Sequence, residues 1–80
     1  MSFFDFLQFY REPGDTPFDD FAADVARDRD FPRKIETSLW NYFWHVRGYL
    51  RVKGACRECL ETLEEAWNWF EDLALDSWRI

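Results

Sequence analysis

Residues 16–29, TPFDDFAADVARDR, carry the clearest helical signal in the chain and decide its fold class, with Arg27 and Arg29 in the last turn, where cations suit the helix dipole. Thr16 can cap the first turn, and Pro17 suits the first helical position because that residue needs no N–H partner. The apolar residues that follow recur at the spacing of one helical face: Phe18, Phe21, Ala22, Val25 and Ala26. Phe31-Pro32 then ends the segment, since helix is disfavoured before proline, and we expect Phe31 to be buried beneath the turn.

A shorter helix is expected upstream, from Ser2 to Arg11. Ser2 can cap its first turn, and Asp5 follows three residues later, where a negative charge suits the positive end of the helix dipole. One face of this helix is apolar and consists of Phe3, Phe6, Leu7 and Tyr10. An apolar face of this kind has to be buried against other elements of the fold.

A third helix is predicted downstream. It begins near Thr37-Ser38 and runs to about Arg47, where Gly48 is expected to stop it. Residues 49–53 alternate like a strand, but an isolated strand would have no partner. We therefore interpret them as a connector or as a short extension of the helix.

A fourth helix starts after Gly54 and runs to about Asp72 or beyond. A C-terminal turn that folds back is suggested by Leu73, Leu75, Trp78 and Ile80. The apolar stripe of the helix consists of Cys56, Cys59, Leu60, Leu63, Ala66, Trp67 and Phe70. Four short helices with tight loops predict a compact all-α four-helix bundle. The length of 80 residues fits a single domain over residues 1–80.

Composition excludes several classes of protein. No run of about 18 apolar residues exists, so no transmembrane helix is expected, and the start MSFFD lacks the basic region and cleavage site of a secretory signal. The net charge of −6 disfavours a uniformly basic nucleic-acid binder and a polybasic membrane anchor. Two cysteines are too few for a disulfide scaffold. We therefore expect a cytoplasmic protein.

Charge is unevenly distributed along the chain. Residues 1–26 carry a net charge of −5, residues 27–53 of +4 and residues 54–80 of −5. Opposite charges could simply lie near one another in the folded domain, which would leave ordinary solvated faces. Alternatively, the basic middle could contact nucleic acid, with aromatic residues as stacking platforms. In a third interpretation, the acidic ends imitate nucleic-acid phosphates and occupy a partner's site.

No catalytic or metal site stands out in the sequence. Cys56 and Cys59 form a C-x-x-C pair, but thioredoxin-like sites need a βαβ context and a zinc site needs four ligands. His45 is the only histidine. Cysteines three residues apart on an apolar stripe are most often small core residues. We therefore expect both to pack in the core, keep a redox or metal role as the alternative, and predict no catalytic residue, cofactor or metal.

Aromatic residues make up 21% of the chain, an unusually high share. Ten fit the helical stripes and are the expected core rings: Phe3, Phe6, Tyr10, Phe18, Phe21, Phe31, Tyr42, Phe43, Trp67 and Phe70. Seven do not fit: Phe4, Phe9, Trp40, Trp44, Tyr49, Trp69 and Trp78. Because exposed Trp and Arg are frequent hot spots of interfaces, we predict a partner-binding surface. Its candidate residues are Trp40, Trp44, Arg47, Arg51, Trp69, Glu61, Glu64 and Glu65.

Five short motifs occur along the chain in an order typical of a known family: SFFDFL at residues 2–7 with Tyr10-Arg11, Phe21-Ala22 with Asp28, Phe31-Pro32-Arg33, Leu39-x-x-Tyr42-Phe43, and Leu60-x-x-Leu63-Glu64-Glu65-Ala66-Trp67 with Phe70. In these motifs the chain resembles the YozE-like family of small bacterial and phage proteins with a sterile-alpha-motif-like fold. The resemblance covers about residues 2–70, departs in residues 44–59, and leaves residues 71–80 as an extension. It implies a four-helix, sterile-alpha-motif-like domain and no chemistry.

The function expected from these observations is that of a small non-enzymatic protein-interaction module, which binds a protein partner or a second copy of itself. A sharper form of this hypothesis makes it a phage-encoded inhibitor that imitates nucleic acid and acts on a host nucleic-acid machine. The alternative is a nucleic-acid-binding domain that uses the basic segment 27–53. Neither hypothesis involves a membrane or a small-molecule substrate.

Overall fold

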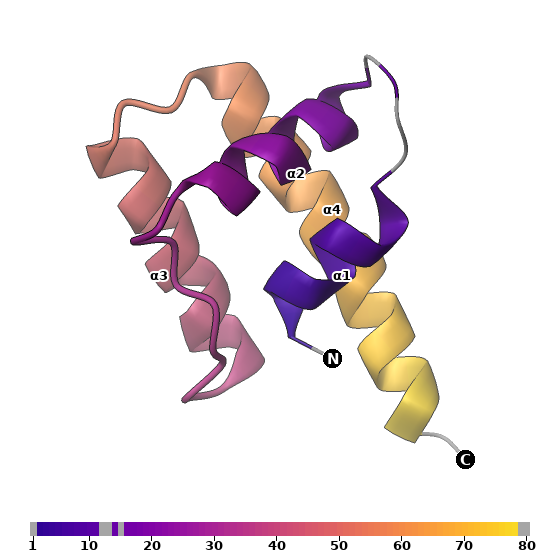
Figure 1. Ribbon diagram of the computed structural model, residues 1–80. Helices are drawn as coiled ribbons and strands as arrows, with labels where there is room; N and C mark the ends of the chain where they lie inside the picture. Colours follow the sequence, from indigo (N-terminus) through magenta and orange to yellow (C-terminus); the bar gives the residue numbers. More distant parts are fainter. Residues whose placement is uncertain (1, 12–13, 15, 79–80) are drawn as a thin grey trace.

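The structure, a computed structural model, describes the backbone of residues 2–11, 14 and 16–78, and the side chains of these residues as far as residue 74. Within this part of the chain the backbone forms four α-helices: α1 (Phe3–Tyr10), α2 (Pro17–Arg27), α3 (Leu39–Val52) and α4 (Arg57–Trp78). α4 is the central element and packs against each of the other three helices. α1 and α2 cross one side of α4, and α3 runs beside it in the opposite direction (Figure 1). The predicted all-α, four-helix fold is confirmed.

Short polar side chains cap the first turns of α1, α2 and α3. The hydroxyls of Ser2, Thr16 and Ser38 each accept a hydrogen bond from the backbone N–H three residues later. These bonds satisfy N–H groups that a helix leaves without a partner in its first turn. Thr16 also donates to the Asp19 carboxylate at 2.7 Å, so the expected cap of α2 is confirmed.

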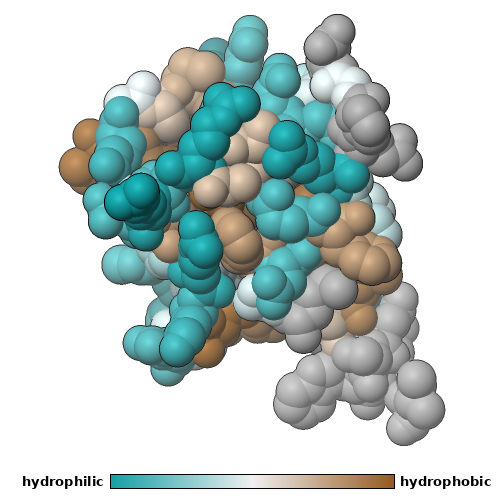
Figure 2. Space-filling view, viewed as in Figure 1, coloured by the Kyte–Doolittle hydropathy of each residue, from teal (hydrophilic) through white to brown (hydrophobic). Residues whose placement is uncertain are grey.

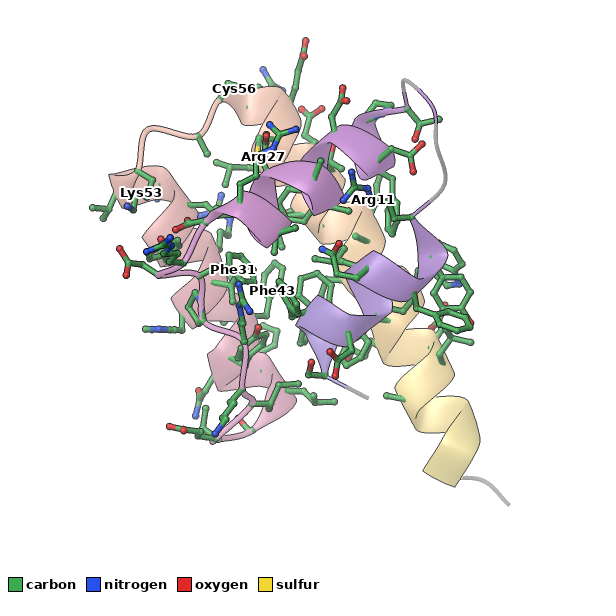
Figure 3. The ribbon with its side chains drawn as sticks, in the orientation of Figure 1. Arg11, Arg27, Phe31, Phe43, Lys53 and Cys56 are labelled. Atoms are coloured by element: carbon green, nitrogen blue, oxygen red, sulfur yellow. The ribbon has the colours of Figure 1, made fainter. Side chains whose placement is uncertain are left out.

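The core is built mainly from aromatic rings. Phe3 and Phe6 of α1 are fully buried, and the Phe3 ring meets the Trp67 ring of α4 edge to face at 5.0 Å between centroids. Phe31 and Phe43 point into the interior from the linker and from α3 (Figure 3). Of the ten rings expected in the core, eight are buried, while Tyr10 and Phe18 are half-buried at its edge. The buried aliphatic residues are Leu7, Ala22, Val25, Val46, Leu63 and Ala66.

The linker between α2 and α3 is fastened to α3 by two tyrosines. Tyr42 donates its hydroxyl to the carbonyl of Pro32, and Tyr49 donates to the Asp28 carboxylate at 2.6 Å. Phe31 is 3% exposed and packs edge to face against Tyr49. The predicted burial of Phe31 is therefore confirmed. On the outer surface, Figure 2 shows mostly hydrophilic side chains over α2 and this linker.

Three boundary predictions were wrong. α2 ends at Arg27 and does not include Arg29. α3 does not stop at Gly48 but continues to Val52, because Tyr49 and Leu50 still pack against the core. Of the two interpretations of residues 49–53, the short extension of the helix is confirmed as far as Val52. The stop falls at Gly54, whose φ of 87° is open only to glycine without strain. α4 does not turn back after residue 72 but continues as helix to Trp78. Among the helices described here, none is both long and apolar enough to cross a membrane.

The two glycines at this end of α3 give a first prediction. Gly48 lies in the helix, and a methyl group added there would meet nothing within 4 Å, so Gly48→Ala should stabilise the fold by about 0.4–1 kcal/mol. Gly54→Ala should destabilise it by about 1–2 kcal/mol, because the positive φ is strained for any residue with a Cβ. Urea denaturation of the two variants measures both values. If both variants changed the free energy of unfolding by the same amount in the same direction, α3 would not end between Gly48 and Gly54 as described.

The bond between Tyr49 and Asp28 gives a second prediction, on pH. It lowers the pKa of the Asp28 carboxyl from its ordinary value of 3.8. Burial, with the same bond, raises the pKa of Tyr49 to about 12. A lowered carboxyl pKa stabilises the fold at pH values above 3.8, and this contribution is lost as the pH falls through the folded-state pKa.

Tyr49→Phe should therefore lower the unfolding midpoint at neutral pH, and its difference from the wild type should shrink in acid. Tyr42→Phe is the matched control, because its lost partner is a carbonyl that does not titrate. Thermal unfolding followed at a series of pH values tests both. A Tyr49→Phe deficit that stays constant from neutral pH to pH 2–3, like that of the control, would show that Asp28 is not involved.

Candidate interaction surface

One side of α3 presents a row of two tryptophans and two arginines, which we name the α3 stripe: Trp40, Trp44, Arg47 and Arg51. Arg47 is half-buried and the other three are exposed. These positions follow one another at intervals of three or four residues, so they share one side of the helix. Tyr42 and Tyr49, which bond to the linker, lie on the opposite side of α3. The stripe is therefore covered neither by the linker nor by the core.

The two tryptophans of the α3 stripe are strongly exposed. The exposed fraction is 69% for Trp40 and 47% for Trp44, and their rings pack edge to face with centroids 5.6 Å apart. Trp44 also contacts the core ring of Phe43 at 5.4 Å. The pair therefore forms a surface that is anchored to the core through Phe43 but remains open to a partner.

Arg47 extends this surface. Its guanidinium carbon lies 5.6 Å from the centre of the Trp44 ring, within the range of a cation–π contact. The Nε atom of Arg47 is buried and has no hydrogen-bond partner in the described part of the molecule. α3 contains no Asp or Glu, so no carboxylate of its own helix neutralises Arg47 or Arg51.

The acidic residues predicted for the site lie on the outer side of α4. Glu61, Glu64 and Glu65 are all exposed. Glu61 accepts a hydrogen bond from Arg57 at 3.0 Å, but both side chains are largely exposed, so this pair contributes little stability. We call Glu61, Glu64, Glu65 and Glu71 the acidic edge of α4.

The α3 stripe and the acidic edge border the same seam between helices. Phe43 of α3 packs against Trp67 of α4 at 5.5 Å. Arg47 lies one turn beyond Phe43, and Glu64 lies one turn before Trp67. Because the two helices run in opposite directions (Figure 1), Arg47 and Glu64 lie at a similar level along the helix axes, on the same side of this contact.

Trp69 belongs to a different surface. Its ring contacts Tyr10 of α1 at 4.7 Å, Phe18 of α2 at 5.6 Å and buried Phe6 at 5.1 Å. Phe9 extends this aromatic patch with 70% of its surface exposed. Phe9 was counted among the residues outside the core stripes but was not predicted as a binding residue, although its position on α1 placed it beside Tyr10.

The predicted partner-binding residues thus do not form one site. The structure divides them into the α3 stripe, the acidic edge of α4 and the patch around Trp69. Of the seven unassigned aromatic residues, the exposed ones are Phe9, Trp40, Trp44 and Trp69. Phe4 and Tyr49 are half-buried against the core, and the side chain of Trp78 lies outside the described residues.

The basic middle of the chain does not form one basic surface. Arg27 pairs with Asp24 on its own helix at 3.7 Å, Arg33 lies over the Phe4 ring at 4.2 Å, and Lys53 lies 5.6 Å from the Tyr49 ring. Only Arg47 and Arg51 fall on the α3 stripe. The charge of residues 27–53 is therefore distributed over several faces.

The prediction that both cysteines pack in the core was wrong for Cys56. It is an exposed free thiol, whereas Cys59 is free and half-buried. Cys56 precedes α4, so the periodicity of the helix does not place it on the buried side. His45 is exposed and lines an open hollow of about 590 Å³ beside Arg33 and Lys34. In the described part of the chain, no three His, Cys, Asp or Glu residues gather where they could hold a metal ion.

Comparison with known proteins adds the family. A family model described as YozE SAM-like fold matches residues 2–72. No curated protein and no solved structure matches the chain. The match covers α1, α2, α3 and α4 as far as residue 72, including the region around the cysteines where the motif spacing departs from the expected pattern. The resemblance seen in the sequence is thus confirmed, and the chain belongs to the YozE SAM-like family.

Proposed function

We propose that this protein is a non-enzymatic interaction module that binds a partner protein through the α3 stripe. The observation that carries the proposal is the exposure of Trp40 and Trp44 side by side on a helix whose other side is buried. Contiguous exposed apolar surface of this kind is typical of protein interfaces. The YozE SAM-like family, to which the chain belongs, is not a known family of enzymes.

The chemistry of the stripe indicates a partner segment that combines apolar and acidic side chains. A large aromatic residue buries about 150–250 Å² when it is covered, so two tryptophans supply the centre of a small interface. Arg47 has a buried Nε without a partner, and Arg51 lies exposed one turn further along. A carboxylate of the partner that reached Arg47 would form a charge-assisted hydrogen bond.

The same surface could also stack nucleic-acid bases, but the charges favour a protein. Affinity for nucleic acid depends on how many phosphates the cations neutralise, and only two cations lie on the α3 stripe. The exposed carboxylates of the acidic edge lie on the neighbouring helix and would repel phosphates. The chain as a whole carries a net charge of −6.

Replacing both tryptophans of the stripe tests the proposal. Trp40→Ala with Trp44→Ala should abolish capture of partner proteins from a host lysate, since each truncated hot spot costs about 2 kcal/mol or more. Phe9→Ala is the matched control, because Phe9 is as exposed as Trp40 but lies in the patch around Trp69. The measurement is mass spectrometry of the proteins retained by each variant, followed by titration of the retained partner.

Three results would contradict the proposal. The first is equal retention of the same proteins by the double variant and the wild type. The second is loss of retention in Phe9→Ala alone, which would move the interface to the patch around Trp69. The third is binding of DNA or RNA at low salt that weakens steeply with added salt and is lost in Arg47→Ala with Arg51→Ala, which would favour the nucleic-acid alternative.

A second candidate function rests on the acidic edge of α4. Three of its carboxylates, those of Glu61, Glu64 and Glu65, are exposed within five consecutive residues of α4, and Glu71 is half-buried further along the helix. A group of fixed negative charges can occupy a site built for phosphates. A phage-encoded inhibitor of a host nucleic-acid machine would act in this way. This candidate needs a partner with a basic groove, in contrast to the acidic partner of the α3 stripe.

Neutralising the acidic edge distinguishes the two candidates. If the protein imitates nucleic acid, replacing Glu61, Glu64, Glu65 and Glu71 by Gln should abolish competition with DNA or RNA for the captured partner, and the competition by the wild type should weaken with added salt. If the α3 stripe is the binding surface, the four replacements should leave capture intact. A competition assay with labelled oligonucleotide measures the difference, and unchanged competition would exclude the second candidate.

A further inference from the structure

Cys56 and Cys59 lie on the first turn of α4. Cys56 immediately precedes the helix, and its carbonyl accepts the first helical hydrogen bond from the N–H of Leu60 at 3.1 Å, which makes it the N-cap residue. Cys59 follows three positions later. Figure 3 shows Cys56 at the start of α4, away from the interior marked by Phe31 and Phe43.

This placement satisfies the distance that a disulfide requires. Residues three apart on an α-helix have Cα atoms about 5 Å apart, which falls inside the range of about 4.4–6.8 Å for disulfide-bonded cysteines. The backbone before Cys56 is held in place, because Ala55 donates its N–H to Leu50 at 2.9 Å and Gly54 makes the turn. The two sulfurs can therefore be joined without unfolding either helix.

The two thiols differ in their surroundings. Cys56 is exposed, whereas Cys59 is half-buried against the core. Burial raises the pKa of the Cys59 thiol, and the neighbouring charges of Cys56 and Asp24 raise it further. A thiol of raised pKa is a poor first nucleophile, so an incoming reagent meets Cys56 first.

Space for a reagent is present on both sides of the pair. Two hollows of about 260 and 300 Å³ each include both cysteines in their walls. α2 supplies Phe21 and Asp24 to both hollows, and Lys53 and Ala55 line the second. A small thiol compound bonded to Cys56 would lie here, next to Cys59.

We propose that Cys56 and Cys59 form a dithiol site that reacts with low-molecular-weight disulfides and closes to an intramolecular disulfide. The Cys56 thiolate attacks one sulfur of the disulfide, forms a mixed disulfide and expels one thiolate. The Cys59 thiolate then attacks the Cys56 sulfur and expels the second thiolate. Two cysteine thiols are oxidised to one disulfide, the reagent is reduced to two thiols, and the two cysteine protons end on those thiols.

The second step is favoured by proximity. Two groups held on one turn of a helix have an effective concentration in the millimolar range or above, so Cys59 displaces the bound thiol faster than a second molecule in dilute solution does. The site acts independently of the α3 stripe, because neither cysteine belongs to that surface. It therefore adds a redox-sensitive modification to the proposed interaction module.

Oxidised glutathione tests the proposal on the folded full chain. We expect the wild type to lose both free thiols, to retain no glutathione and to remain a monomer in non-reducing electrophoresis and intact-mass measurements. Cys59→Ser should stop at the mixed disulfide, with one glutathione on Cys56. Cys56→Ser should react at least about tenfold more slowly, because Cys59 is half-buried. In urea, which exposes both residues, the two single variants should react at similar rates.

Circular dichroism of both single variants shows whether each remains folded. The proposal is overturned if the wild type retains glutathione on Cys56 without transfer to Cys59, or if it forms a disulfide between two chains instead. It is equally overturned if the folded Cys56→Ser and Cys59→Ser variants react at the same rate. Reduction of the oxidised wild type by dithiothreitol should restore both thiols.

Discussion

The contact between Phe3 and Trp67 lies where α1, α3 and α4 meet. Phe3 belongs to α1, near the beginning of the chain, and Trp67 lies in the middle of α4. Phe3 is fully buried and also meets Phe70 of α4 and Tyr42 of α3. One ring from a helix of only eight residues thus fills the space in which α3 and α4 meet. Without the Phe3 ring, α1 would lose a main contact with α4, and a cavity would form among the neighbouring rings.

Most of this architecture could be predicted from periodicity and caps. Thr16-Pro17 marked the start of α2 in the sequence. Of its predicted apolar positions, Phe21, Ala22 and Val25 are buried, Phe18 is half-buried and Ala26 is exposed. The ends of α3 and α4 could not be predicted in the same way. Gly48 is exposed to solvent within α3, where its low helix propensity only makes the helix slightly less stable. Gly54, in contrast, adopts a positive φ. Composition does not distinguish these two uses of glycine, because backbone conformation decides between them.

The sequence predicted which candidate residues share one side of a helix, but not which helices bring their candidate residues together. The spacing of Trp40, Trp44, Arg47 and Arg51 already placed these residues on one side of a helix. Which helix faces meet is a property of the fold, so Trp69 proved to lie with Tyr10 and Phe18 rather than with the other tryptophans. Cys56 was misplaced for a related reason: a helical pattern was extended to a residue that only caps the helix.

The distribution of tryptophan among these environments has a spectroscopic consequence. Trp67 is 5% exposed in the core, whereas Trp40, Trp44 and Trp69 face solvent. The fluorescence of these four tryptophans in the folded protein is therefore a sum of a blue-shifted, shielded emission and a red-shifted emission that a soluble quencher can reach. Unfolding changes the first component, and a partner covering α3 changes the second. A single chain thus carries separate optical signals for the integrity of its core and for the occupancy of its surface.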